Sequence, residues 1–281
     1  MFLGDYRIEI IPDTEFRLDG GAMFGVVPRV VWERVCPPDE LNRVRLNMNC
    51  LFIETPREKI LIETGIGEKW TEKQTRNYGI FRAKPFAETF FEKTKCRPED
   101  ISIVINTHLH FDHAGGNTIL DQTGKVVPQF PNARYFVSQS EFEHAENPHE
   151  RDRASYLPEN WRPIWESGQL ELKPEVYEIV EGLTIENIRG HSETMQTICL
   201  RRGGETLYGF ADLIPTRHHL ALPWIMGYDL YPTETLVFKK EVLPRALKEN
   251  WICLFYHDFE IPLCRLREAD GKLKAESYVE S

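Results

Sequence analysis

Short apolar segments recur along most of the chain, and they follow one of two patterns. Some alternate apolar with polar residues, which is typical of strands with one buried face. Others are continuous runs rich in β-branched residues, which is typical of fully buried strands. Strands are therefore predicted over residues 6–11, 48–54, 59–63, 101–106, 133–138, 176–180, 183–188, 196–201, 205–210 and 251–256.

Apolar residues spaced three and four apart predict helices over 86–96 and 233–248. Ser138 or Ser140 is expected to cap a shorter helix just after the fifth strand. The strands come in two batches, with helices between and after them. This order predicts an α/β protein whose two sheets are faced by helices within a single domain, residues 1–281.

Two segments carry apolar side chains without a clear period. The first covers about 12–47 and the second covers 213–231, and we expect both to be loops that flank a functional site. A contact between two copies of the chain is an equally good interpretation of the second loop. The polar tail after residue 265 is expected to be a last helix or a frayed end. The loop residues that we expect to contact substrate are Met23, Phe24, Val26, Trp224 and Met226.

Composition narrows the range of partners. The hydrophobic share of 41% and the charged share of 28% describe an ordinary globular protein. The net charge of −10 argues against nucleic acid as a partner, because phosphates would be repelled. No apolar stretch is long enough to cross a membrane, and the N-terminal residues do not resemble a secretory signal. The six cysteines form no C-x-x-C pair, so a reduced, cytoplasmic location is expected.

The most informative stretch follows the buried strand predicted at 101–106. There His108, His110, Asp112 and His113 lie within six residues, and two glycines come directly afterwards. Imidazole and carboxylate are the usual ligands of zinc and related divalent metals. A loop leaving the strand can direct the first two histidines at one ion, and the next turn can direct Asp112 and His113 at a second.

Three further donors each come directly after a predicted strand: His191, Asp212 and His257. Donors at strand ends collect at one edge of a layered α/β fold. A single histidine in such a place is more often a hydrogen-bonded core residue than a ligand. Three in matching positions, following the histidine-rich cluster, favour a shared metal site.

The sequence resembles the metallo-β-lactamase superfamily over about residues 45 to 260, both in its motifs and in the order in which they occur. The resemblance implies a four-layer αβ/βα sandwich with two divalent metal ions at one edge. The matching segments are Ile60–Gly65, Thr107–His113, Gly190–Ser192, Asp212 and Tyr256–His257.

The resemblance also implies how the donors divide between the ions. One ion would be bound by His108, His110 and His191. The other would be bound by Asp112, His113 and His257. Asp212 would bridge the two, and Asp112 and Asp212 would be the acidic groups at the reaction centre. Zinc is the first choice of metal, with iron, manganese or cobalt as the other options.

Within the superfamily, the features favour the lactonase and methyl-parathion-hydrolase-like branch. His110 stands where the diiron flavoproteins of the family tend to have Glu, and β-lactamases generally lack the bridging Asp212. Two departures are present. Glu63 stands where the family usually has Asp, and it would support a metal-site loop from one methylene farther away. No Tyr follows Asp212, where acyl-homoserine lactonases place one near the substrate carbonyl.

These expectations define a dinuclear-metal hydrolase that attacks esters or lactones with a hydroxide shared by the ions. Acyl-homoserine lactones are one substrate class, phosphotriesters are another, and the substrate is expected to carry an apolar acyl or aryl group. The alternatives are a mononuclear-iron oxidoreductase of the same fold, a β-lactamase-like hydrolase and a metal-stabilised binding protein. His218 and His219 are interpreted as surface or supporting residues rather than catalytic ones.

Overall fold

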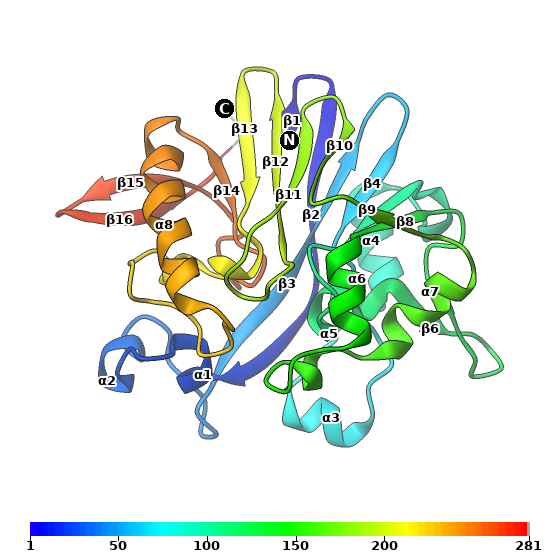
Figure 1. The fold of residues 1–281 in the computed structure, drawn as a ribbon, viewed down its shortest axis with the longest axis horizontal. Helices are drawn as coiled ribbons and strands as arrows, with labels where there is room; N and C mark the ends of the chain where they lie inside the picture. Colours follow the sequence, from blue (N-terminus) through cyan, green and yellow to red (C-terminus); the bar gives the residue numbers. More distant parts are fainter. Residues whose placement is uncertain (280–281) are drawn as a thin grey trace.

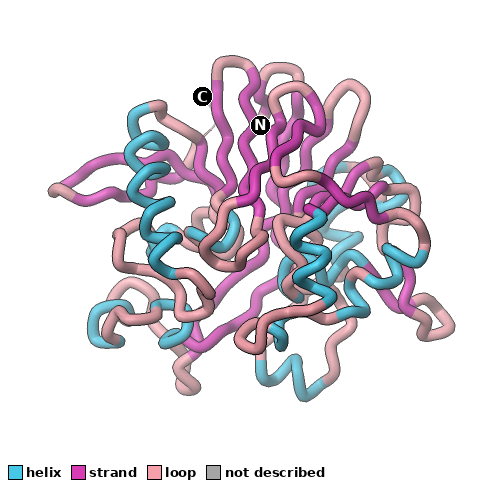
Figure 2. Tube along the Cα trace, in the orientation of Figure 1, coloured by secondary structure: helices cyan, strands magenta, loops and turns pink. Residues whose placement is uncertain are grey.

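The computed structural model describes residues 1–279. Two seven-stranded sheets form its centre, and helices cover their outer faces (Figure 1). One sheet has the order β1-β2-β3-β4-β5-β8-β9, and the other runs from β10 to β16 in sequence order. The tube view shows the strands gathered centrally, with helices on both sides (Figure 2). The predicted αβ/βα sandwich is confirmed.

The first sheet joins antiparallel strands at its N-terminal end to parallel strands at the other. β4, β5, β8 and β9 pair in parallel, and the central strand β5 is buried throughout. The strands of this sheet are β1 (Phe2–Leu3), β2 (Tyr6–Asp19), β3 (Arg43–Glu54), β4 (Lys59–Ile62), β5 (Ile103–Ile105), β8 (Arg134–Ser138) and β9 (Leu170–Lys173).

The second sheet is antiparallel except for the pairing of β13 with β14. Its strands are β10 (Val176–Val180), β11 (Leu183–Asn187), β12 (Gln196–Arg202), β13 (Glu205–Gly209), β14 (Ile252–Leu254), β15 (Leu263–Ala269) and β16 (Lys272–Ser277). A separate two-stranded ribbon pairs β6 (Thr118–Leu120) with β7 (Val126–Pro128).

Helices α4, α6 and α7 lie beside the first sheet, and α8 lies beside the second (Figure 1). Ser138 caps α6 by accepting a hydrogen bond from the amide of Glu141, as the sequence predicted. Within residues 1–279, no helix combines the length and apolar character that crossing a bilayer requires. The helices are α1 (Gly20–Phe24), α2 (Arg29–Trp32), α3 (Glu72–Asn77), α4 (Phe86–Thr94), α5 (Phe111–Ala114), α6 (Gln139–Glu146), α7 (Arg162–Glu166) and α8 (Pro232–Lys248).

The predicted loop over 12–47 is wrong in large part. β2 continues to Asp19 and pairs with β3 along a long ribbon, with a register shift between Pro12 and Glu15. The register shift and the proline interrupt the alternation of apolar and polar residues, so a strict period of two does not predict this strand. Asp19 then caps α1, accepting a hydrogen bond from the amide of Ala22.

Residues 266–277 are also not helical or frayed. β15 and β16 form a hairpin in which Ala269 pairs with Lys272 across a two-residue turn. Both turn residues have positive φ, 55° at Asp270 and 68° at Gly271. Asp-Gly is the strongest short-range hairpin signal, and the sequence carries it at this turn.

Candidate metal centre

The histidine-rich cluster is held by the backbone around it. The chain leaves β5, passes His108, and enters the short helix α5, for which His110 is the N-cap residue. The two glycines after α5 let the backbone come very close to the segment that follows β4. A Cβ on Gly115 would lie 2.2 Å from the carbonyl oxygen of Ile66, so no larger residue fits there without movement.

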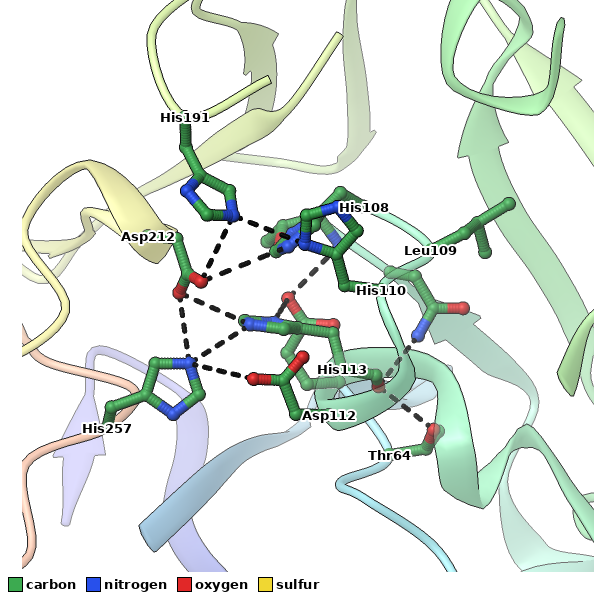
Figure 3. A network of polar contacts seen from close by, with 12 residues as sticks. Thr64, His108, Leu109, His110, Asp112, His113, His191, Asp212 and His257 are labelled. Atoms are coloured by element: carbon green, nitrogen blue, oxygen red, sulfur yellow. Dashed lines mark hydrogen bonds and ion pairs between the residues drawn. The ribbon is translucent and has the colours of Figure 1, made fainter. Parts of the chain in front are cut away.

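Five imidazoles and two carboxylates converge at this edge of the sheets, from segments far apart in the sequence (Figure 3). All seven side chains are buried. They form two groups, in each of which the donor atoms lie within 4.8 Å of one another. The first group is His108, His110 and His191, and the second is Asp112, His113, Asp212 and His257.

Asp212 faces both groups. Its Oδ1 lies 3.2 Å from Nε2 of His113 and 3.0 Å from Nε2 of His257. Its Oδ2 lies 3.4 Å from Nε2 of His191 and 4.0 Å from Nε2 of His108. The preceding residue, Ala211, is held at φ 47°, a left-handed conformation that costs free energy in a residue with a side chain. Each carboxylate oxygen of Asp212 thus lies near one of the two groups, as the bridging position implied by the resemblance requires.

Neighbouring groups fix how the rings are turned. Nδ1 of His257 donates to the carbonyl of Asn47 at 3.0 Å, and Nδ1 of His191 donates to Asp229 at 3.0 Å. In a neutral imidazole the other nitrogen, Nε2, then carries the lone pair. Both rings thus direct Nε2, the atom that would bind a metal, at the centre of the site.

Glu63 contacts the ring of a third metal-donor residue, His113. It is fully buried, and its Oε1 lies 3.2 Å from Nδ1 of His113 and accepts a hydrogen bond from the amide of Thr107 at 3.1 Å. Its backbone φ is 63°, a left-handed conformation that costs free energy in a residue with a side chain. The carboxylate contacts both the ring and the loop that carries the cluster.

The donor set fits a pair of divalent cations. Burial lowers the pKa of His108 and of His110 well below the usual range, which keeps both rings neutral. Burial alone would raise the pKa of Asp212, but His257 and His113 beside it hold that pKa well below its usual range. Nε2 of His108 has no hydrogen-bond partner among the described residues, although it is buried. Facing lone pairs and a carboxylate are stable together when cations lie between them.

A cavity of about 410 Å³ lies beside the two groups. His110, Asp112, His191, Asp212 and His257 form part of its wall. The remainder of the cavity wall is largely apolar. Its polar groups come from two tyrosines and from the segment around residue 152, which the sequence did not predict to lie at the site. Side chains in this remainder include Leu18, Met23, Tyr78, Phe111, Met226 and Tyr228.

Of the five residues expected to contact substrate, the structure brings Met23 and Met226 to this cavity. The other three lie elsewhere. The ring of Phe24 stacks on Trp32 and on His219 in the interior, Val26 is 89% exposed, and Trp224 lines a separate surface groove. The five residues therefore do not form one wall, because Phe24 packs in the interior, Val26 follows the turn at Gly25, and Trp224 lies at the other groove.

The two histidines after Asp212 differ in their surroundings. His219 is buried, lies 2.8 Å from Thr216 Oγ1, and donates from Nε2 to the carbonyl of Met23 at 2.9 Å. Burial lowers the pKa of His219 to about 3, so the ring is neutral. It holds the backbone of a cavity-wall residue in place. His218 is partly buried and lines a neighbouring pocket.

Asp229 is a supporting residue that sequence reasoning missed. Its Oδ1 accepts from His191, and its Oδ2 accepts from Thr235 on α8 at 2.7 Å. It is buried within the segment that the sequence analysis interpreted as an apolar loop. A single carboxylate in a loop belongs to no repeating pattern, so the sequence does not predict the contact of Asp229 with His191.

Comparison with known proteins agrees with this geometry. Residues 44–257 match the family model described as the metallo-beta-lactamase superfamily. The chain belongs to this superfamily. It is 31% identical to a solved structure described as a probable metal-dependent hydrolase from Staphylococcus aureus, with a TM-score of 0.90 over 99% of this chain and 98% of that one.

Other similar proteins are described as lactonases. The chain is 25% identical over 240 residues to an N-acyl homoserine lactonase of Bacillus cereus, covering 78% of this chain and 84% of that protein. A solved structure of a dizinc quorum-quenching lactonase in complex with a product shares the fold, with 18% identity and a TM-score of 0.80 over 100% of this chain and 97% of that one.

Proposed function

We propose that this protein is a dinuclear-metal lactonase that hydrolyses N-acyl homoserine lactones and related esters. The observation that carries the proposal is the position of Asp212, which faces two groups of buried donors at the wall of a largely apolar cavity. His108, His110 and His191 would hold one ion, and Asp112, His113 and His257 the other. Zinc is the proposed metal, because nitrogen and carboxylate donors in buried sites suit it.

When bound, the two ions supply a water whose pKa is lowered from about 15.7 toward 7 and an electrophile for the substrate oxygen. The chain's own residues do the rest. Asp212 keeps the two donor groups in register and can hold the proton that passes to the leaving oxygen. Asp229 and the Asn47 carbonyl keep the rings of His191 and His257 turned toward the site.

The cavity supports the choice of substrate. Met23, Met226 and Leu18 offer apolar surface for an acyl chain. The phenols of Tyr78 and Tyr228 are protonated hydrogen-bond donors at neutral pH, since burial raises the pKa of Tyr228 to about 12. In the absence of a tyrosine directly after Asp212, either can contact the substrate's carbonyl region.

The proposal is tested with purified protein of measured metal content, assayed on lactones, aryl esters, phosphotriesters and a β-lactam, with and without chelator. We expect two ions per chain and the highest kcat/KM with N-acyl homoserine lactones, lost on chelation and restored by zinc. Hydrolysis of the β-lactam alone, or a single iron with no hydrolysis, would overturn it. A cytoplasmic location remains a prediction and needs separate localisation.

A further inference from the structure

One buried carboxylate lies behind the first group of metal donors and belongs to neither group. Glu141 stands in the first turn of α6, and its side chain is fully buried. Its Oε1 accepts a hydrogen bond from the amide of Leu109 at 2.7 Å, and its Oε2 accepts one from the hydroxyl of Thr194. Burying a carboxylate costs free energy that an apolar side chain in the same place would not cost. The two hydrogen bonds offset part of this cost, and they connect two separate segments of the chain.

These two segments carry all three donors of the first group. Leu109 stands between two of the donors, and its side chain points away from the cluster of rings (Figure 3). Thr194 follows the third donor, His191, by three residues in the loop between β11 and β12. Each carboxylate oxygen of Glu141 therefore holds one of the two segments from which the first group is built.

A backbone hydrogen bond joins the same two segments farther from the donors. The amide of Gln196 donates to the carbonyl of Thr107 at 2.8 Å, where β12 begins. Between the segments, Nε2 of His191 lies 3.2 Å from Nδ1 of His110. Glu141 adds a second connection, one residue away from two of the donors and three residues away from the third.

The second group of donors is held by other residues. Glu63 contacts the ring of His113, and the carbonyl of Asn47 accepts a hydrogen bond from the ring of His257. Among the residues that the structure describes, no hydrogen bond or ion pair links Glu141 to a donor of this group. A change at Glu141 should therefore act on the first group and spare the second.

We propose that Glu141 is a positioning residue, which sets the spacing of the two segments around the first ion and so the affinity for that ion alone. This role rests on the proposed dinuclear-metal function, because it needs an ion in each group. Groups behind the ligands of a metal typically change its affinity by about 10- to 100-fold when they are lost. We expect a loss of this size, confined to the first group, when the carboxylate of Glu141 is removed.

Two substitutions separate the connection from the charge. A glutamine side chain can still accept from the amide of Leu109 through its carbonyl, and its NH₂ can donate to Thr194, because a hydroxyl accepts as well as donates. A leucine side chain can form neither hydrogen bond. Glu141→Gln should therefore retain most of the affinity that Glu141→Leu loses, although both variants lose the charge.

The test is a zinc titration of the full-length protein in competition with a coloured chelator. It uses two backgrounds that each keep one group complete: His257→Ala keeps the first group, and His110→Ala keeps the second. Glu141→Leu should weaken zinc binding about 10- to 100-fold in the His257→Ala background. The same change should leave zinc binding unchanged in the His110→Ala background. A general loss of stability would not produce this selectivity.

A second variant removes the same contact from its other end. Thr194→Val keeps the carboxylate but removes the hydroxyl, so it should weaken zinc binding in the His257→Ala background by a smaller factor than Glu141→Leu. Added to Glu141→Leu, it should cause no further loss, because residues that act through one contact are not additive. Glu143→Leu changes an exposed carboxylate on the same helix and is the matched control, with no expected effect.

The outcomes separate this role from the proposed function. Equal zinc affinity with and without Glu141→Leu in the His257→Ala background, or equal losses in both backgrounds, would overturn the role of Glu141. A loss in Glu141→Gln as large as that in Glu141→Leu would also overturn it. Wild-type protein that binds two zinc ions but opens no lactone would overturn the proposed function, while selective weakening by Glu141→Leu would still support the role of Glu141.

Discussion

Nε2 of His113 lies 3.1 Å from Nε2 of His257, although the two residues are 144 positions apart in the sequence. Asn47 and Glu63 contact the Nδ1 atoms of these rings, so both Nε2 atoms are directed at the same place as Oδ1 of Asp212. Two ring nitrogens and a carboxylate oxygen this close are stabilised by a shared cation. The seven donor side chains converge at this edge of the two sheets.

Asp229 should affect metal binding without touching the metal. Replacing it with Ala leaves Nδ1 of His191 without its acceptor, so the ring loses its fixed orientation. We expect metal affinity at the first group to fall about 10- to 100-fold, measured by competition with a coloured chelator. Glu234→Gln changes a partly exposed carboxylate at the start of α8 and is the matched control. Unchanged affinity in Asp229→Ala would contradict this role.

Lys239 fixes the segment that carries Met226 and Asp229. Its Nζ is buried and donates to the carbonyls of Ala221 at 2.6 Å, Leu222 at 3.3 Å and Trp224 at 2.8 Å. Lys239→Met removes all three bonds and leaves a methionine where the buried donor was, so we expect the free energy of unfolding to fall by about 2 kcal/mol.

The control for this change is Lys240→Met. Lys240 is the next residue on α8 but is exposed, so its loss should change stability by less than about 0.5 kcal/mol. Urea unfolding of the three proteins gives the comparison. Equal stability of Lys239→Met and the wild type would show that the carbonyls find other donors.

The pair of His144 and Asp152 predicts a pH dependence of stability. The hydrogen bond to Asp152 raises the folded-state pKa of His144 above its usual 6.5. The folded state then binds the proton more tightly than the unfolded state, so the pair contributes fully below pH 6.5 and is lost as pH rises through the folded-state pKa. Relative to His144→Gln, the wild type should lose stability between pH 6 and pH 9 in urea unfolding. A constant difference across that range would contradict the assignment.

Sequence reasoning could place the metal donors because their signals are local. Histidine and aspartate at fixed short spacing, and single donors directly after strands, need no knowledge of the tertiary contacts. The structure brings all seven together. Asp229, which holds the ring of His191, could not be predicted from the sequence, because it stands in an irregular stretch where no period marks the direction of its side chain.

The wrong predictions about the fold have equally specific causes. The long ribbon of β2 and β3 was missed because the register shift after Pro12 interrupts the alternation. Val26 was assigned to a binding wall from its apolar character, yet it follows a turn at Gly25, where φ is 56°, and projects to solvent. Apolar character alone does not tell whether a side chain faces a cavity, the core or the exterior.

The number of metal ions per chain, measured by elemental analysis of the wild type and of His257→Ala, is the most direct test of the dinuclear centre. His257 lies only in the second group, so its loss should leave the first group of donors intact. We predict two ions in the wild type and one in His257→Ala. One ion in the wild type, or no difference between the two proteins, would contradict the paired site.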